Sequence, residues 1–306
     1  MVSLSTAAKY KRLLSPFSVC RFVLLLCAAC RLMMPDYGVA AGERILPNPP
    51  AVTAEAAIVV DMKTGGIIYA KNADKREYPA STTKIMTAIL LLEDGDNNQN
   101  VVVSSYAAND EGTALWSGQS MRRFDMLELM LLESDNGAAT ALGESAAGSE
   151  ALFSVMMNKK ARELGMSGTH FVNANGLPDE EHYSTVRDIA RAADYAMDNT
   201  MFRRIVGSPK LLLPDWNTPG AVYEAENTNK LLESYDGCIG IKTGYTQAAG
   251  GCLVSAAQRN GRELLCVVLK SKDMDTRFSD SAALLDYGFL CAENGLAELP
   301  RIEGIK

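Results

Sequence analysis

The sequence predicts an α/β (α+β) fold in which one antiparallel sheet is built from both ends of the chain and flanked by helices. Short apolar runs bounded by turn residues occur at 56–71 and again at 240–270, which is typical of strands. The stretch from about 100 to 235 instead shows mostly helical periodicity. A mostly helical lobe is therefore expected to be inserted between the two halves of the sheet, with a ligand cleft between the lobes.

The first predicted element is a β-hairpin over residues 56–71. Its two apolar runs are joined by a Lys-Thr-Gly segment at 63–65, whose glycine can adopt the positive φ of a tight turn. A helix is expected to follow from about 81 to 92. The polar segment at 94–98, Asp-Gly-Asp-Asn-Asn, breaks this helix.

Four longer helices are expected in the middle of the chain and one near its end. Their apolar residues recur every three or four positions, which is the helical period. Gly-Leu-Pro at 176–178 and Leu-Pro-Asp at 213–215 are expected to be loops. The predicted helices cover 124–132, 136–147, 149–164, 185–197 and 275–287.

Three short apolar runs near the C-terminus predict the remaining strands of the sheet. Asn260-Gly261 separates the last two runs and is a strong signal for a tight hairpin turn. The second Lys-Thr-Gly of the chain lies in the first run, at an expected strand edge that faces the cleft. The runs cover 240–245, 251–257 and 263–270.

Residues 1–41 differ in composition from the rest of the chain. Four basic residues between positions 9 and 21 precede an apolar run at 22–30, which is too short for a membrane span and suits the core of a secretory signal. Small residues at 39–41 offer a cleavage site. This segment is therefore predicted to be a signal peptide or an N-terminal anchor, and the protein to be exported.

The remaining composition excludes several classes of function. The net charge is −7 and no block of basic residues occurs, so a nucleic-acid partner is not expected. The only histidines are His170 and His182, too few for a typical zinc hydrolase site, so no metal and no cofactor are expected. Export would permit disulfides, but the apolar neighbours of most cysteines favour buried free thiols. The cysteines beyond residue 41 are Cys238, Cys252, Cys266 and Cys291.

Three short motifs follow one another along the chain: Ser81-Thr82-Thr83-Lys84, Ser134-Asp135-Asn136 and Lys242-Thr243-Gly244. Ser-x-x-Lys and Ser-x-Asn each occur once in the sequence. Lys-Thr-Gly occurs twice, and the copy at 63–65 is interpreted as the hairpin turn because it precedes the first motif. Each motif alone is weak, so the order of the three indicates function.

Ser81 is the candidate nucleophile and Lys84 is the base that would activate it. A serine hydroxyl needs a base to remove its proton, and residues three apart on a helix share one face. A lysine acts as a base only when it is neutral, and burial or a nearby cation such as Lys242 would lower its pKa. The positive end of the helix dipole would favour developing negative charge at Ser81.

The second motif lies where one apolar helix ends and another begins, and by itself it is typical of a helix N-cap. Its place after the first motif gives it a functional interpretation. Ser134 would pass a proton to a leaving amine, and Asn136 would bind a substrate amide and hold Lys84 in position.

The third motif supplies groups that bind substrate. Lys242 and Thr243 would bind a carboxylate through charge and a hydroxyl donor. Gly244 would let the substrate approach the strand edge, because it has no side chain. The backbone N–H groups of Ser81 and Tyr245 are the expected oxyanion donors. Lys272 and Arg277 follow the last strand and are left out of the predicted site.

The segment from 54 to about 289 resembles the low-molecular-mass D-alanyl-D-alanine carboxypeptidases, serine peptidases of the penicillin-binding group with a β-lactamase/transpeptidase-like fold. The similar stretches are 79–87, 169–173 with Gly176-Leu177, and 236–246. The resemblance implies that the peptidoglycan stem peptide acylates Ser81, that terminal D-alanine leaves and that water releases the shortened peptide. It also implies inhibition by β-lactams and action in the periplasm or another extracytoplasmic cell-wall space.

The chain departs from the family pattern in two places. Asp135 stands where these carboxypeptidases often carry glycine, and the chain ends soon after residue 289, without the C-terminal β-rich domain and amphipathic helix of larger relatives. Membrane attachment would then depend on the N-terminal segment. The expected organisation is a catalytic domain over 42–306, with a sheet lobe at about 50–94 and 236–290 and a helical lobe at about 95–235.

Three alternatives to the carboxypeptidase remain open. The motifs do not separate it from a peptidoglycan endopeptidase. A class A-like β-lactamase would need a glutamate that aligns a water, and no Glu-x-x-x-Asn occurs at 165–185. A non-catalytic cell-wall binding protein would not need the intact Ser81, Lys84 and Lys242.

Overall fold

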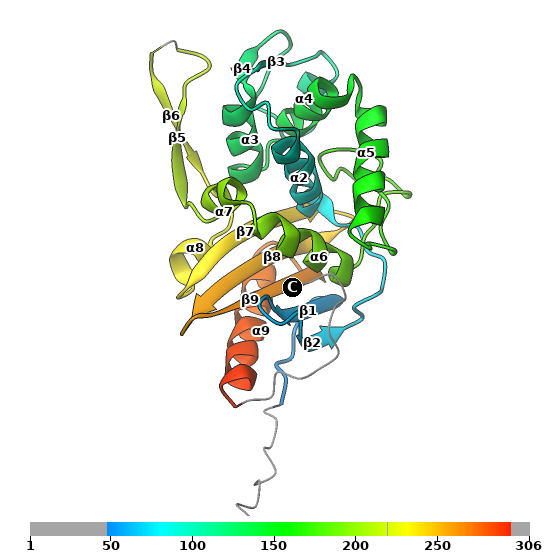
Figure 1. The fold of residues 1–306 in the computed structure, drawn as a ribbon, viewed down its shortest axis with the longest axis vertical. Helices are drawn as coiled ribbons and strands as arrows, with labels where there is room; N and C mark the ends of the chain where they lie inside the picture. The colour runs from blue at the N-terminus through cyan, green and yellow to red at the C-terminus, as the bar shows by residue number, and fades with distance from the viewer. Residues whose placement is uncertain (1–47, 219, 295–306) are drawn as a thin grey trace, which may run out of the picture. The chain divides into compact units, whose positions relative to one another are not determined.

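The computed structural model describes residues 48–218 and 220–294, and within them the two chain ends form one sheet. This five-stranded antiparallel sheet has the order β2-β1-β9-β8-β7 (Figure 1), so β1 pairs with β9, which lies some 200 positions later. The predicted fold class is confirmed. The strands are β1 Ala56–Asp61, β2 Ile67–Lys71, β7 Cys238–Thr246, β8 Gly250–Arg259 and β9 Arg262–Ser271.

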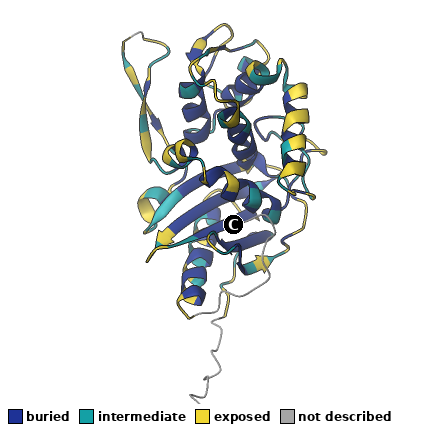
Figure 2. Cartoon of the chain, viewed as in Figure 1, coloured by how far each residue is buried: buried dark blue, intermediate teal, exposed yellow. Residues whose placement is uncertain are grey.

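Both faces of the sheet are covered. Side chains alternate along β1: Ile58 and Val60 belong to the core shared with the helical lobe, whereas Val59 packs with Leu285 of the C-terminal helix on the other face. Figure 2 shows the central strands as buried. Because neither face meets water, these strands read as continuous apolar runs in the sequence.

The first Lys-Thr-Gly of the chain is a structural turn, as predicted. Asp61 accepts hydrogen bonds from the backbone N–H of Lys63 and Thr64, at 3.0 and 3.1 Å, and Gly65 has a φ of +68°. The turn between β8 and β9 also agrees with the prediction, since Asn260 and Gly261 both have positive φ.

The predicted helices agree with the structure in position and type, except that residues 81–83 form a 3₁₀ turn. The helices α7, α8 and η2 were not among those predicted. A 3₁₀ turn, η1, leads into the helix of the first motif, and α9 covers the face of the sheet opposite α6 (Figure 1). The bounds are η1 Ala80–Thr83, α2 Lys84–Asp94, η2 Ala107–Asn109, α3 Arg123–Leu132, α4 Asn136–Ala147, α5 Glu150–Glu163, α6 Val186–Met197, α7 Thr200–Val206, α8 Leu231–Ser234 and α9 Thr276–Glu293.

Two small antiparallel sheets within the 95–235 stretch were not predicted. They are β3 Asn100–Val102 with β4 Ser120–Arg122, and β5 Lys210–Pro214 with β6 Val222–Glu226. The prediction of a loop at 213–215 was wrong for Leu213 and Pro214, which end β5. Proline is tolerated there because it lies at the end of a strand in a two-stranded sheet.

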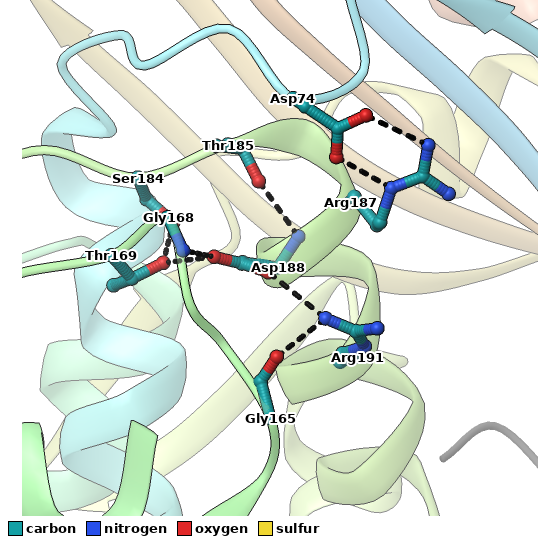
Figure 3. Close-up of polar contacts among 9 residues, drawn as sticks. All are labelled: Asp74, Gly165, Gly168, Thr169, Ser184, Thr185, Arg187, Asp188 and Arg191. Atoms are coloured by element: carbon teal, nitrogen blue, oxygen red, sulfur yellow. Dashed lines mark hydrogen bonds and ion pairs between the residues drawn. The ribbon is translucent and has the colours of Figure 1, made fainter. Parts of the chain in front are cut away.

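Asp188, near the start of α6, closes a loop that reaches the first motif. Its carboxylate accepts hydrogen bonds from Gly168 N at 2.7 Å, from Thr169 Oγ1 at 2.8 Å and from Arg191 at 3.2 Å (Figure 3). Thr169 Oγ1 also bonds Ser184 Oγ at 2.8 Å, across the neck of the loop. The loop from 170 to 183 is therefore fixed at both ends.

Some predictions fall outside the described residues or concern single side chains. The predicted signal or anchor at 1–41 lies outside the described ranges. In residues 48–218 and 220–294, no helix combines the length and the apolar character needed to cross a bilayer. The four cysteines beyond residue 41 are free thiols; Cys252, Cys266 and Cys291 are buried and Cys238 is half-buried.

We expect the free energy of unfolding of the Asp188→Ala variant to fall by about 3 kcal/mol, because the change removes a buried carboxylate that accepts hydrogen bonds from Gly168, Thr169 and Arg191. Asp74→Ala is the matched control: the Asp74 side chain is 73% exposed, and its ion-pair partner among the described residues is Arg187, the neighbour of Asp188 on α6. The free energy of unfolding of the Asp74→Ala variant should fall by less than about 1 kcal/mol. Urea denaturation measures both, and equal losses would contradict the assigned role of Asp188.

Candidate active site

The candidate nucleophile, Ser81, and its candidate base, Lys84, meet at the junction of η1 and α2. Ser81 lies in the 3₁₀ turn, and Lys84 is the first residue of the α-helix. In a 3₁₀ turn, residues three apart lie directly above one another. Lys84 Nζ is accordingly 2.9 Å from Ser81 Oγ. The sequence placed Ser81 in the α-helix itself; the tighter turn brings the same pair together.

Three oxygen atoms surround the Lys84 amine. Besides Ser81 Oγ, Lys84 Nζ donates to Asn136 Oδ1 at 2.6 Å and to the carbonyl oxygen of Asn175 at 2.8 Å. The two oxygens from Asn136 and Asn175 can only accept hydrogen bonds. A neutral amine would therefore direct its two N–H groups at them, and its lone pair would face the Ser81 hydroxyl, which is the arrangement of a general base.

The surroundings favour the neutral amine. Lys84 is fully buried, and burial lowers its pKa to about 7, against the opposing negative charges of Asp135 and Asp110. Of the two causes expected for the lowered pKa of Lys84, the structure gives burial. Burial also lowers the pKa of Lys242, and the positive charges of Lys84 and Arg277 add to that effect.

The loop closed by Asp188 is hydrogen-bonded to η1 and α2, the two elements that carry Ser81 and Lys84. Thr87 Oγ1 donates to Ala174 O at 2.6 Å, and Thr83 Oγ1 lies 2.8 Å from His182 Nε2. Val172 N donates to Nδ1 of the same imidazole, so Nε2 carries the proton and donates to Thr83. Gly176 is required here, because a Cβ would lie 2.0 Å from Ala80 O.

In the second motif, Asp135 fixes the position of its neighbour Asn136. Asp135 is the N-cap of α4 and accepts from Ala138 N at 2.8 Å. The same carboxylate accepts from Thr113 Oγ1 and Ala114 N, both at 2.8 Å. Ser134 is half-buried with a φ of +68°, and among the described residues its hydroxyl has no hydrogen-bond partner. It is therefore free to bond a substrate.

The third motif lies on β7, at the edge of the sheet, against the nucleophile turn. A Cβ on Gly244 would lie 3.0 Å from Ser81 N, so glycine lets the strand approach the turn itself as well as a substrate. Lys242 is buried, and Thr243 Oγ1 bonds Thr228 Oγ1 at 2.6 Å. Arg277, excluded from the predicted site, donates to Gly244 O at 2.7 Å.

A pocket of about 740 Å³ opens beside Ser81. Three of the eight predicted site residues line it directly, namely Ser81, Asn136 and Tyr245. Lys84 is hydrogen-bonded to Ser81, and Gly244 packs closely against the Ser81 backbone. The positive charge of Lys84 lowers the pKa of Lys242, which places the two lysines near each other. The full lining is Ser81, Glu111, Gly112, Asn136, Gly176, Leu177, Pro178, Tyr245, Thr246, Gln247 and Ala248.

A family model for D-alanyl-D-alanine carboxypeptidases matches residues 44–273. The chain belongs to this family. It is 35% identical over 257 residues to the D-alanyl-D-alanine carboxypeptidase of Streptomyces sp. (strain K15), which covers 78% of this chain and 88% of that relative. It is 34% identical over 243 residues to the D-alanyl-D-alanine carboxypeptidase DacF of Bacillus subtilis, spanning 77% of this chain and 62% of DacF.

Solved structures lead to the same family. The Streptomyces K15 DD-transpeptidase matches with a TM-score of 0.74 at 31% identity, covering 80% of this chain and all of that one. Some relatives of this carboxypeptidase are named D-alanyl-D-alanine endopeptidase. The predicted family and enzyme class, a serine-type hydrolase of the penicillin-binding group, are confirmed.

Sequence reasoning missed three contributors to the site. The Asn175 carbonyl is a backbone group and gives no signal in the sequence. His182 is a lone histidine 99 positions from its partner Thr83. Arg277 follows the last strand where the resemblance is loose.

The reactivity of this carboxypeptidase should follow the protonation of Lys84. Because the pKa of Lys84 is lowered to about 7, the fraction of neutral base rises as the pH rises through that value. The second-order rate constant for acylation by a penicillin should therefore increase with an apparent pKa near 7 and level off above it. A rate that increases only near the ordinary lysine pKa would contradict the assignment.

His182 should make the enzyme sensitive to acid. Burial lowers the pKa of His182 from 6.5 to about 4, so its contribution to stability is complete above 6.5 and is lost as the pH falls through 4. The free energy of unfolding should fall by about 3 kcal/mol from this residue alone. Denaturant titrations between pH 7 and 4 should show a flatter pH dependence for His182→Gln; parallel curves would refute the role.

Proposed function

We propose that this chain removes the terminal D-alanine from peptidoglycan stem peptides through an acyl-enzyme on Ser81. The observation that carries the proposal is the Lys84 amine, buried and held 2.9 Å from Ser81 Oγ by two acceptors. Lys84 takes the hydroxyl proton as Ser81 attacks the carbonyl of the penultimate residue. The C–N bond then breaks, and D-alanine leaves with a proton delivered to its amine. Water hydrolyses the ester and restores Ser81.

The other predicted residues take roles around that step. Ser134, whose hydroxyl is free, passes the proton to the leaving amine, and Asn136 holds Lys84 while offering its amide to the substrate. The backbone N–H groups of Ser81 and Tyr245 stabilise the oxyanion, each contributing roughly 3 kcal/mol. Lys242 and Thr243 bind the terminal carboxylate. A carboxylate beside Lys242 would counter the burial that lowers its pKa.

The positions of Glu133, Glu180 and Glu181 do not support a β-lactamase. Glu133, which adjoins the second motif, is engaged elsewhere: it accepts from Tyr223 Oη at 2.6 Å and from Glu226 N at 3.3 Å. Glu180 and Glu181 line a separate cavity beside Arg76 and Tyr183. These acids are therefore not placed to align a water on a Ser81 ester. An endopeptidase is the second candidate, supported by the relatives that carry this name.

The cellular setting follows from the same proposal. A substrate in the cell wall lies outside the cytoplasm, so the segment 1–41 would direct export as a cleaved signal or as a retained anchor. β-Lactams would acylate the same serine and inhibit the enzyme. The catalytic domain would then comprise 42–306, with the site between its sheet and helical parts.

The Ser81→Ala variant should lose all labelling by a fluorescent penicillin and lower kcat on a pentapeptide by about a thousandfold or more. Ser279→Ala, an exposed serine of α9, is the matched control and should behave as the wild type. Intact-mass analysis should show one penicilloyl group on the wild type alone. Labelling that persists in Ser81→Ala would refute the nucleophile.

Mass analysis of products decides between the two peptidases. We expect the wild-type enzyme to release D-alanine from a pentapeptide faster than it cleaves a cross-linked dimer. The reverse order would establish the endopeptidase, and rapid turnover of a chromogenic cephalosporin would favour the β-lactamase instead.

A further inference from the structure

We infer that Glu111 selects substrates that carry a free ammonium group on the acyl side of the scissile bond, next to the D-alanyl-D-alanine end. This inference rests on the proposed function and adds the chemical class of the stem peptide. Three features of the pocket support it: the direction of the substrate along β7, the fixed position of the Glu111 segment and the charge of the pocket lining.

The direction of the substrate follows from the third motif. Lys242 and Thr243, the proposed carboxylate-binding groups, precede Tyr245 on β7. The pocket extends to the other side of Tyr245, where Thr246, Gln247 and Ala248 line it. The leaving D-alanine therefore lies toward Lys242, and the acyl part of the peptide fills the pocket of about 740 Å³.

Glu111 stands at this acyl side because two contacts fix its segment. Its carbonyl oxygen accepts from Asn136 Nδ2, and Asn136 Oδ1 in turn accepts from Lys84. Two and three residues after Glu111, Thr113 Oγ1 and Ala114 N both donate to the Asp135 carboxylate at 2.8 Å. The family-atypical Asp135 thus anchors the segment that presents Glu111 next to the catalytic asparagine.

The charge of the pocket follows from its lining. Of the residues that line it, Glu111 is the one with a formal charge at neutral pH. Glu111 is exposed, and within the described part of the chain no cation pairs with its carboxylate. A peptide bound here meets one unpaired negative charge, which attracts an ammonium group and gives no advantage to its neutral acetylated form.

Two peptides that differ in one charge test the inference: Nα-acetyl-L-lysyl-D-Ala-D-Ala, and the same peptide acetylated on Nε. The wild type should cleave the free-amine peptide with a kcat/KM about three- to fivefold higher at low salt, the range of an exposed ion pair, and added salt should reduce this ratio. Glu111→Gln should bring the ratio to about one. Glu111→Lys should invert it.

Asp236→Asn is the matched control, because it removes one negative charge just before the start of β7, at the end away from Thr246, where the side chain is 95% exposed. Its ratio should equal that of the wild type. A ratio of one in the wild type, or an equal loss on both peptides in Glu111→Gln, would overturn the inference. If the wild type cleaves neither peptide and takes no penicillin label, the proposed function itself has failed.

Discussion

The burial of one amine among three oxygens is the constraint on which the rest of this structure depends. Lys84 is contacted by Ser81, Asn136 and the Asn175 carbonyl, which come from three separate parts of the chain. With a pKa near 7 in place of 10.5, keeping this amine in the folded protein costs about 5 kcal/mol at pH 7 and below. The remaining packing must offset that cost, and a base active at neutral pH results.

Contacts around the site hold these three chain segments in place relative to one another. The Asp188 carboxylate closes the neck of the loop that carries Asn175, and His182 and Thr87 bond the same loop to the nucleophile helix. Asp135 caps α4 and so fixes Asn136. On the remaining side, Gly244 lets β7 approach the Ser81 turn. The sheet supports this strand because both of its faces are packed, one against helices of the inserted lobe and one against α9.

Local patterns predicted most of the fold, and they predicted several of the residues that the structure brings together around Ser81. The helix over 136–147 was placed correctly because its N-cap and periodicity are local signals, and the two hairpins because Gly65 and Asn260-Gly261 suit their turns. Features that depend on tertiary contact were not predictable. The hairpin of β5 and β6 overrode the loop signal of Pro214, and the partner of a backbone carbonyl such as that of Asn175 leaves no trace in the sequence.

A direct titration of Lys84 tests whether its amine loses its proton near pH 7. Lysines labelled with ¹³C at Cε can be followed by NMR across the pH range, and the Lys84 signal can be assigned by its loss in a Lys84→Met variant. We predict that the Lys84 resonance titrates near pH 7, well below the exposed lysines. A Lys84 resonance that titrates near 10.5 would contradict it, because the amine would then be an ammonium and have no lone pair to accept the Ser81 proton.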